Sequence, residues 1–166
     1  MYNLTHQEVG EATHSAQRLI PAFRHYDTAQ VRAAIGKMHE MYSLPVSFVP
    51  TLDNERTEAF TRILQKEVNE SKDVMDSVKN YHTIKDTPGA LPEDIEEAYT
   101  AALTDQADWL NDIIVYCLSE QLRLGIDPFV CIPIIMNSNF TKLGADGLPI
   151  MDEDGKVCKG PNFKKP

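Results

Sequence analysis

The chain has 166 residues, of which 42% are hydrophobic and 25% charged, as expected for one globular domain with its own core. Its formal net charge of −9 argues against a general nucleic-acid-binding surface, because contacts to phosphates need basic patches. The sequence contains no run of about 18 apolar residues, so it predicts no membrane span. We therefore expect a single domain over residues 1–166.

The first half of the chain predicts three helices. A capping-box pattern opens the first, over about residues 5–20, and a proline ends it. The second is expected over about 28–42, followed by an extended connector over 43–52 that contains two prolines. Asp53 then caps a long third helix that runs to about Asn80.

A fourth helix is predicted after a loop. Pro92 suits its first turn, and Glu93 and Asp94 lie near the positive end of its dipole. The helix is expected to continue to Leu124, with a break near Thr104 as one alternative.

The last part of the chain predicts a short helix and an irregular tail. Gly125 is the expected C-cap of the fourth helix, and Asp127 opens a last helix to about Phe140. The tail over 144–166 is rich in turn residues, and a short hairpin is predicted around Asp154 and the glycine that follows it. The fold class predicted is an all-α bundle of about four to five helices with an irregular C-terminal tail or short hairpin.

Two acids interrupt the apolar face of the third helix. At about 100° per residue its apolar residues form one stripe, with Glu67 in the middle and Glu70 at the edge. A carboxylate that faces a core is costly unless a group of opposite charge pairs with it. Asp73 and Asp76 point elsewhere and are interpreted as a solvated face. The apolar stripe consists of Phe60, Ile63, Leu64, Val68, Val74, Met75 and Val78.

Three aspartates gather on the fourth helix. Asp105, Asp108 and Asp112 fall within about 60° of one another, beside an apolar face that includes Trp109. Packing the two helices by these faces would bring four or five carboxylates together, and such a cluster repels itself unless a cation lies within it. Oxygen-only ligands favour Mg²⁺ or Mn²⁺ over zinc. For any single pair of acids, a solvated helix face is the commoner explanation.

Positive charge is concentrated in the last quarter of this acidic chain. A metal-filled acidic site flanked by lysines is what a polyphosphate substrate requires. The alternative is that the lysines only keep the tail soluble. They are Lys142, Lys156, Lys159, Lys164 and Lys165.

Other candidate groups point to no further chemistry. The histidines are scattered and are interpreted as surface or core residues, with His39 a candidate to line a pocket. The glycine motifs of P-loop and dinucleotide-binding proteins are absent. Ser119 and Cys117 have no evident base, so no nucleophilic triad is predicted. Trp109 and Tyr116 are interpreted as core side chains.

The three cysteines have no spacing typical of a metal site. An odd number of cysteines, together with an N-terminus that lacks a signal-peptide pattern, predicts reduced thiols and a cytoplasmic location. The cysteines are Cys117, Cys131 and Cys158.

Several segments, in order along the chain, resemble the all-α nucleoside triphosphate pyrophosphohydrolases, that is, the MazG-like and phosphoribosyl-ATP pyrophosphohydrolase-like proteins. The resemblance covers roughly Val31 to Pro166 and leaves residues 1–26 outside. The tail segment over 154–161 is its most specific part. The segments that carry the resemblance are His39 to Pro50, Arg56 to Glu70, Asp108 to Tyr116, Leu124 to Asp127, Asn137 to Lys142 and Asp154 to Pro161.

The resemblance implies a helical core completed by oligomerisation, which predicts a homodimer or homotetramer. It also implies cleavage of a nucleoside triphosphate between its α- and β-phosphates, which releases a nucleoside monophosphate and pyrophosphate. The implied catalytic and Mg²⁺- or Mn²⁺-binding residues are Glu67, Glu70, Asp108 and Asp112. The implied substrate-binding residues are Asn139, Lys142, Lys156 and Lys159, joined by Arg56 and His39.

The chain departs from the family pattern at two acids. Lys66 stands where the commoner Glu-Glu-x-x-Glu pattern has its first acid, and Trp109 stands at the Glu of the commoner Glu-x-x-Asp pattern. Asp108 or Asp105 is expected to substitute for the second of these.

The resemblance leaves several functions open. A pyrophosphohydrolase of this kind removes non-standard nucleotides or, as in a phage enzyme, reshapes a nucleotide pool. The MazZ-type proteins, which remove dGTP, are a purine-selective form of the latter. The alternatives are a phosphoribosyl-ATP pyrophosphohydrolase and a non-catalytic helical oligomer in which the site has degenerated.

Overall fold

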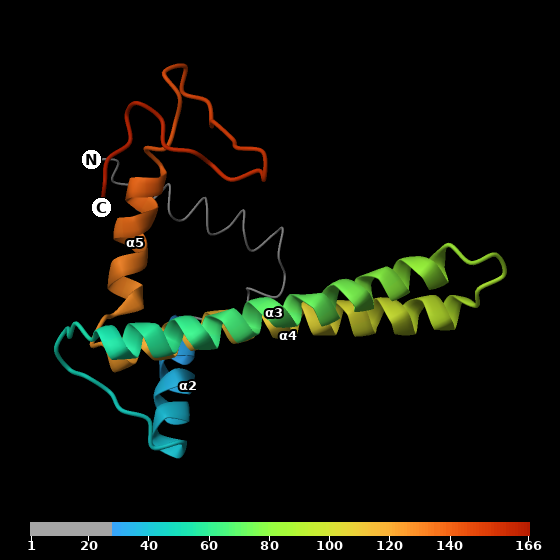
Figure 1. Ribbon diagram of the computed structural model, residues 1–166, viewed down its shortest axis with the longest axis horizontal. Helices are drawn as coiled ribbons and strands as arrows, with labels where there is room; N and C mark the ends of the chain where they lie inside the picture. The colour runs from blue at the N-terminus through green and yellow to red at the C-terminus, as the bar shows by residue number, and fades with distance from the viewer. Residues whose placement is uncertain (1–27) are drawn as a thin grey trace. The chain divides into compact units, whose positions relative to one another are not determined.

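The computed structural model describes residues 28–166, so the helix predicted over 5–20 lies outside the described residues. Across the described residues the secondary structure is helical apart from one isolated antiparallel bridge in the tail. The prediction of an all-α fold is therefore confirmed (Figure 1). The helices are α2 (Thr28–Met41), α3 (Asn54–Lys85), α4 (Pro92–Arg123) and α5 (Pro128–Asn139).

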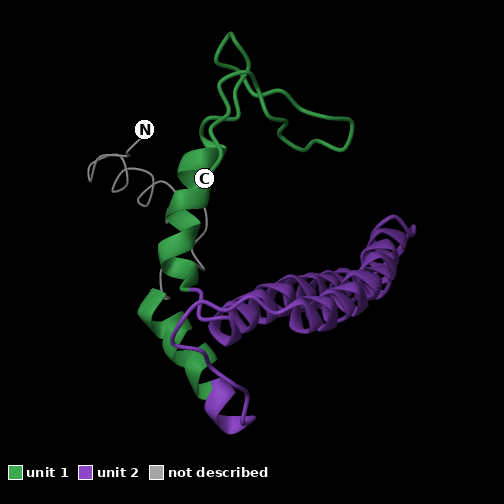
Figure 2. Cartoon of the chain, turned by 60° about the vertical axis from the view of Figure 1, so that its left-hand side comes forward, with its two compact units in different colours: residues 1–37, 127–166 green, residues 38–126 purple. Residues whose placement is uncertain are grey.

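The chain divides into two compact units (Figure 2). One comprises residues 38–126 and contains α3 and α4 together with the connector that precedes them. The other comprises residues 1–37 and 127–166, and its described part contains most of α2, all of α5 and the tail. None of the helices in the described part of the chain is both long and apolar enough to cross a bilayer.

Helix α3 begins where the sequence predicts and extends past its predicted end. The Asp53 carboxylate accepts a hydrogen bond from the Arg56 backbone N–H at 2.9 Å, as an N-cap does. The helix continues beyond Asn80 because its last turns still pack on α4. The ring of Tyr81, for example, lies 5.5 Å from that of Tyr99, measured between centroids.

Helix α4 runs without interruption, so the alternative of a break near Thr104 is wrong. The Thr104 hydroxyl donates to the Thr100 carbonyl at 2.8 Å, which satisfies its polar group within the helix. Leu124 caps the helix, and Gly125 follows with a φ of +70°. A Cβ at Gly125 would lie 2.2 Å from the carbonyl oxygen of Val49, so both the backbone angle and the space require glycine.

Helices α3 and α4 lie side by side and antiparallel, as a helical hairpin (Figures 1 and 2). The apolar core between them is small. Val74 of α3 and Ala98 and Ala102 of α4 are its buried apolar side chains among the described residues. The two alanines allow the helices to approach closely, and polar contacts hold much of the remaining interface.

The connector over 43–52 is extended and hydrogen-bonds to the end of α4. The Ser47 backbone N–H donates to the Leu122 carbonyl at 3.2 Å, and that of Thr51 donates to the Leu124 carbonyl at 2.9 Å. These bonds satisfy two of the carbonyl groups that a helix leaves free at its carboxyl end.

In the other unit, α5 begins at the predicted N-cap. The Asp127 carboxylate accepts a bond from the Phe129 backbone N–H at 2.9 Å and pairs with Arg32 at 3.2 Å. The Arg32 guanidinium lies 5.0 Å from the centre of the Phe129 ring. The predicted turn after Asp154 is present, closed by a bridge between Met151 and Val157.

Candidate functional site

Glu67 lies on the inner face of the α3–α4 hairpin, as its place in the apolar stripe predicts. It is 7% exposed, whereas Glu70, one turn on, and Asp112 of α4 are both exposed. Burial raises the pKa of Glu67 above its ordinary value of 4.5, and the nearby charges of Glu70 and Asp112 raise it further. Lys66 opposes this rise in pKa more weakly. The structure thus brings three of the four predicted ligand residues close enough for their charges to interact.

Tyr116 joins this cluster, although the sequence interpretation assigned it to the core. Its pKa is raised by burial and then by the charges of Glu67, Asp112 and Glu70. Tyr116 follows Asp112 by one helical turn, so the two residues share one face of α4. In the sequence, the spacing of four residues between Asp112 and Tyr116 already placed them on one helix face. We call Glu67, Glu70, Asp112 and Tyr116 the carboxylate cluster.

Trp109 also differs from its interpretation as a core side chain. It is half-buried, and its indole N–H donates to the backbone carbonyl oxygen of Glu67 at 2.7 Å. This hydrogen bond crosses from α4 to α3 at the residue whose carboxylate is most buried. The hydrogen bond therefore sets the register of α4 against α3, with the turn that contains Trp109 facing Glu67.

Asp105 and Asp108, the other two aspartates predicted to gather on α4, lie outside the carboxylate cluster. Asp105 accepts a hydrogen bond from the Ser77 hydroxyl at 2.5 Å, which ties it to α3. Asp108 is exposed and lines a shallow groove with Thr104 and Asn111 on its own helix. Asp108 is not among the charges that shift the pKa of Glu67.

Arg56, a predicted substrate contact, lies in the first turn of α3 and pairs with a buried acid in the last turn of α4. Its guanidinium donates to both carboxylate oxygens of Glu120, with a shortest distance of 2.6 Å. Glu120 is 5% exposed, and the hydrogen bond to it is the main cause of a raised pKa for Arg56. Burial lowers the pKa of Arg123, which lies close enough for the charges of Arg56 and Glu120 to act on it. The sequence analysis did not single out Glu120.

His39, the other predicted substrate contact upstream, is the most buried side chain of the described residues at 1% exposure. Its Nε2 lies 2.8 Å from the Ser119 hydroxyl and its Nδ1 lies 3.2 Å from the Pro45 carbonyl oxygen. A carbonyl only accepts, so Nδ1 carries the proton and a neutral ring accepts from Ser119 at Nε2. The contacts join the end of α2, the connector and α4.

The predicted phosphate contacts belong to the unit that contains α5 and the tail. The Asn139 side chain lies 4.0 Å from the sulfur of Met136. The Lys156 backbone N–H donates to Asp152, and the Lys159 ammonium lies 4.9 Å from the centre of the Phe163 ring. Lys142 closes a turn at the end of α5 through its backbone N–H. Their role in phosphate binding stays a prediction.

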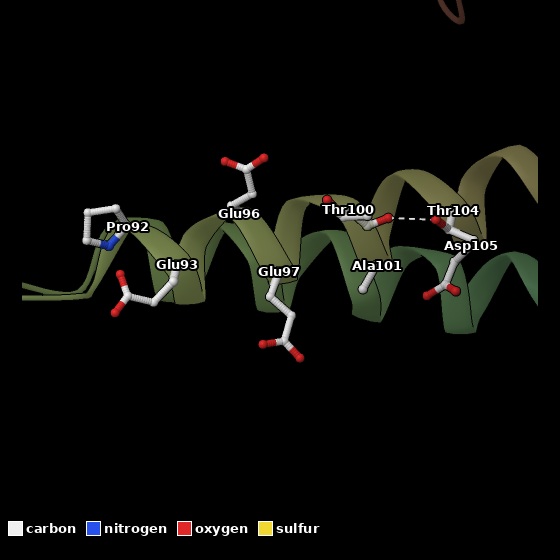
Figure 3. Close-up of a pocket in the computed structure, with 8 residues that line it drawn as sticks. All are labelled: Pro92, Glu93, Glu96, Glu97, Thr100, Ala101, Thr104 and Asp105. Carbon is white, nitrogen blue, oxygen red and sulfur yellow. Dashed lines mark hydrogen bonds between the residues drawn. The ribbon is translucent and has the colours of Figure 1, made fainter.

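A second acidic surface was not predicted. A groove runs along α4 near its N-terminus and contains three glutamates, but all its lining residues come from this one helix (Figure 3). Glu96 and Glu97 point away from each other in Figure 3, so their carboxylates do not converge on one point. The carboxylate cluster is the better candidate site because two helices contribute to it. The groove is lined by Pro92, Glu93, Glu96, Glu97, Thr100, Ala101, Thr104 and Asp105.

The donor chemistry of the carboxylate cluster fits a hard divalent cation. Three carboxylates supply oxygen ligands, and their mutual repulsion, felt most by Glu67, is what a cation relieves. Within residues 28–166 no three acid, histidine or cysteine side chains converge closely enough to hold a metal ion as they lie. Ligation therefore requires Glu70 and Asp112, both exposed, to turn towards Glu67.

A comparison with protein-family models finds no match to this chain, and a comparison with curated proteins finds no significant similarity.

Proposed function

We propose that this protein is a metal-dependent nucleoside triphosphate pyrophosphohydrolase that cleaves between the α- and β-phosphates. The observation that carries the proposal is the buried Glu67, whose pKa is raised by burial and by Glu70 and Asp112. A buried acid with like charges beside it destabilises a fold, so its place is better explained by a ligand than by packing. The bond cleaved and the pyrophosphate product rest on the sequence resemblance. Purine selectivity, with dGTP as substrate, is the finer form of the proposal.

The residues of the carboxylate cluster would divide the work. Glu70 and Asp112, exposed at the rim, would hold Mg²⁺ or Mn²⁺ together with Glu67. When bound, the cation neutralises phosphate charge and lowers the pKa of water. Glu67, with its raised pKa, is suited to accept the proton of the attacking water at a carboxylate oxygen. Tyr116, beside these carboxylates, would donate a hydrogen bond from its hydroxyl.

We also propose that copies of the chain associate through one face of the hairpin. Each of the two helices carries a stripe of apolar side chains at helical spacing, away from its buried inner face. These side chains are 46–54% exposed. Burial of these side chains between copies would supply the core that a single hairpin lacks. The hairpin's apolar face consists of Val68, Met75, Tyr99, Leu103, Leu110 and Ile114.

Product analysis tests the reaction. The protein is incubated with each common ribo- and deoxyribonucleoside triphosphate and with phosphoribosyl-ATP, in Mg²⁺ or Mn²⁺, and the products are separated by chromatography. The expected products are a nucleoside monophosphate and pyrophosphate in equal amounts. A nucleoside diphosphate with orthophosphate would refute cleavage between the α- and β-phosphates. Phosphoribosyl-ATP as the preferred substrate would assign the protein to the metabolic alternative.

One observation favours the second candidate, a non-catalytic helical oligomer. Trp109 occupies the position of a family acid, and Asp108 does not join the carboxylate cluster. Under this alternative the protein self-associates but hydrolyses none of the nucleotides. Association without turnover, measured on the same sample, would therefore favour it over the enzyme.

A further inference from the structure

The end of α2 and the connector that follows it present large apolar residues to solvent. Phe48 is 95% exposed and Leu52 is fully exposed, the two highest values among the large apolar residues that the structure describes. Four neighbours in the sequence are 39–66% exposed. We call the six residues the connector surface: Met41, Tyr42, Val46, Phe48, Val49 and Leu52.

The connector surface is also uncharged. Residues 41–52 contain no acidic or basic side chain, although a quarter of the whole chain is charged and its net charge is −9. Over most of an acidic chain, close approach of a second copy brings like charges together, which costs energy. Two copies that meet at the connector surface avoid this repulsion within the segment itself.

The backbone beneath the connector surface is already held in place. The backbone N–H groups of Ser47 and Thr51 donate to carbonyl groups at the carboxyl end of α4, at 3.2 and 2.9 Å. The Pro45 carbonyl oxygen lies 3.2 Å from the ring of the buried His39. A partner would therefore not have to order a flexible loop, and the entropic cost of binding is smaller for that reason.

The size of the connector surface matches one half of a protein–protein interface. With the exposed fractions given above, the six residues present on the order of 800 Å² to solvent, which is about what each partner contributes to an interface of standard size. The largest apolar patch of a typical monomer is only about 300–600 Å². Aromatic residues and methionine, which are enriched at interfaces, make up half of the connector surface.

We propose that the connector surface binds the same surface of a second copy of this chain. Such an interface is isologous, and it is distinct from the hairpin's apolar face. Two different isologous interfaces on each chain are what a closed tetramer with D2 symmetry uses, so the assembly is a tetramer and not a dimer. The tetramer rests on the association through the hairpin's apolar face proposed above, whereas the pairing of connector surfaces does not.

Two substitutions, made alone and together, test the two interfaces. Phe48→Asp places a charge in the connector surface, and because Phe48 is 95% exposed, the fold of a single copy loses little contact. Leu110→Lys places a charge in the hairpin's apolar face. Multi-angle light scattering at micromolar concentration should show a tetramer for the full unaltered chain, a dimer for either variant and a monomer for the double variant.

A matched control is Leu148→Asp, which adds the same charge at a residue of the tail that is 63% exposed and should leave the mass unchanged. Circular dichroism establishes that every variant keeps its helices. If Phe48→Asp keeps the mass of the unaltered chain, the proposal is overturned, and the connector surface is left to another part of the same copy or to a different protein.

The remaining outcomes separate the two interfaces. If the unaltered chain is a dimer that Phe48→Asp converts to a monomer and Leu110→Lys does not, the pairing of connector surfaces stands and the hairpin interface fails. A dimer that only Leu110→Lys dissociates would give the reverse result and overturn the connector surface. A monomeric unaltered chain would overturn both interfaces.

Discussion

At Glu67 the stability of the fold and the proposed chemistry make opposite demands. The carboxylate is buried on the face that would otherwise hold an aliphatic side chain, and two further acids raise its pKa. A buried charge without a strong partner lowers the free energy of unfolding. A cation that binds only the folded state would restore that stability by mass action.

Glu67→Gln separates these two effects. The amide keeps the shape of the side chain and removes its charge, so the apo variant should melt at a higher temperature than the unaltered chain. Turnover should be abolished, and the rise in melting temperature caused by Mn²⁺ should disappear. The measurements are thermal melts with and without Mn²⁺, beside turnover. Asp73→Asn, on the exposed side of α3, is the control and should change neither. Full activity together with a full Mn²⁺ effect in Glu67→Gln would contradict the metal-site role.

The raised pKa of Glu67 also predicts how stability depends on pH. Between its ordinary pKa of 4.5 and the higher value in the folded protein, the folded state binds more protons than the unfolded state. The contribution of Glu67 to the free energy of unfolding is therefore most favourable below pH 4.5 and falls as pH rises through the folded pKa. Urea unfolding of the metal-free protein at several pH values measures this slope. The slope should be less negative in Glu67→Gln, and an identical profile in both proteins would disprove the assignment.

Where α3 begins and α4 ends, polar groups as well as apolar packing join the two long helices to each other and to α2. Near the end of α4, Glu120 pairs with Arg56 and Ser119 bonds to His39, and all but Arg56 are buried. Removal of one partner from such a buried pair leaves the other uncompensated, which is costly. Because these contacts already occupy Arg56 and His39, a role for either in substrate binding requires that they exchange partners.

The close approach of the connector to Gly125 gives a prediction about this end of the hairpin. Gly125→Ala would place a methyl group against the Val49 carbonyl and force a non-glycine residue to a φ of +70°. We expect a loss of at least about 1–3 kcal/mol in the free energy of unfolding. Gly155→Ala is the matched control, because its φ of +77° is similar but the space for a Cβ is open. Chemical denaturation of both variants should show the larger loss at Gly125, and equal losses would mean that the contact with Val49 is unimportant.

At the scale of the whole molecule, many large apolar side chains of the described residues remain exposed, while few are buried. The hairpin of one copy buries little apolar surface, which is why we propose association through the hairpin's apolar face. The carboxylate cluster is a poor interface, since association there would place the negative charges of one copy against those of another. Association through the apolar face leaves each carboxylate cluster open to substrate.

Leu110→Lys tests this interface. Leu110 is 46% exposed in the middle of the hairpin's apolar face, and a lysine there would have to be buried in any assembly of that kind. Multi-angle light scattering at micromolar concentration should show a dimer or tetramer for the unaltered chain and a smaller species for the variant. Leu148→Lys, an exposed apolar residue of the tail, should leave the mass unchanged. A monomeric mass for the unaltered chain would rule out the proposed interface.

The four described helices follow from the sequence, because the signals that start and end a helix are local. Asp53 and Asp127 cap their helices as predicted, Pro92 opens α4, and Gly125 follows its end. The burial of Glu67 was also predictable, since a period of 3.6 residues fixes which side chains share a face. The break considered near Thr104 failed because a threonine hydroxyl can bond within its own helix.

Which side chains of α4 lie near Glu67 depends on how the two helices pack, and no local pattern in the sequence predicts it. Helical periodicity states which residues share a face, but the register and rotation of one helix against another depend on contacts far apart in sequence. Those contacts bring Asp112, Tyr116 and Trp109 to Glu67 and leave Asp108 on an outer groove. The same register buries Glu120 against Arg56, which lies 64 residues before it, and no local pattern encodes that pairing.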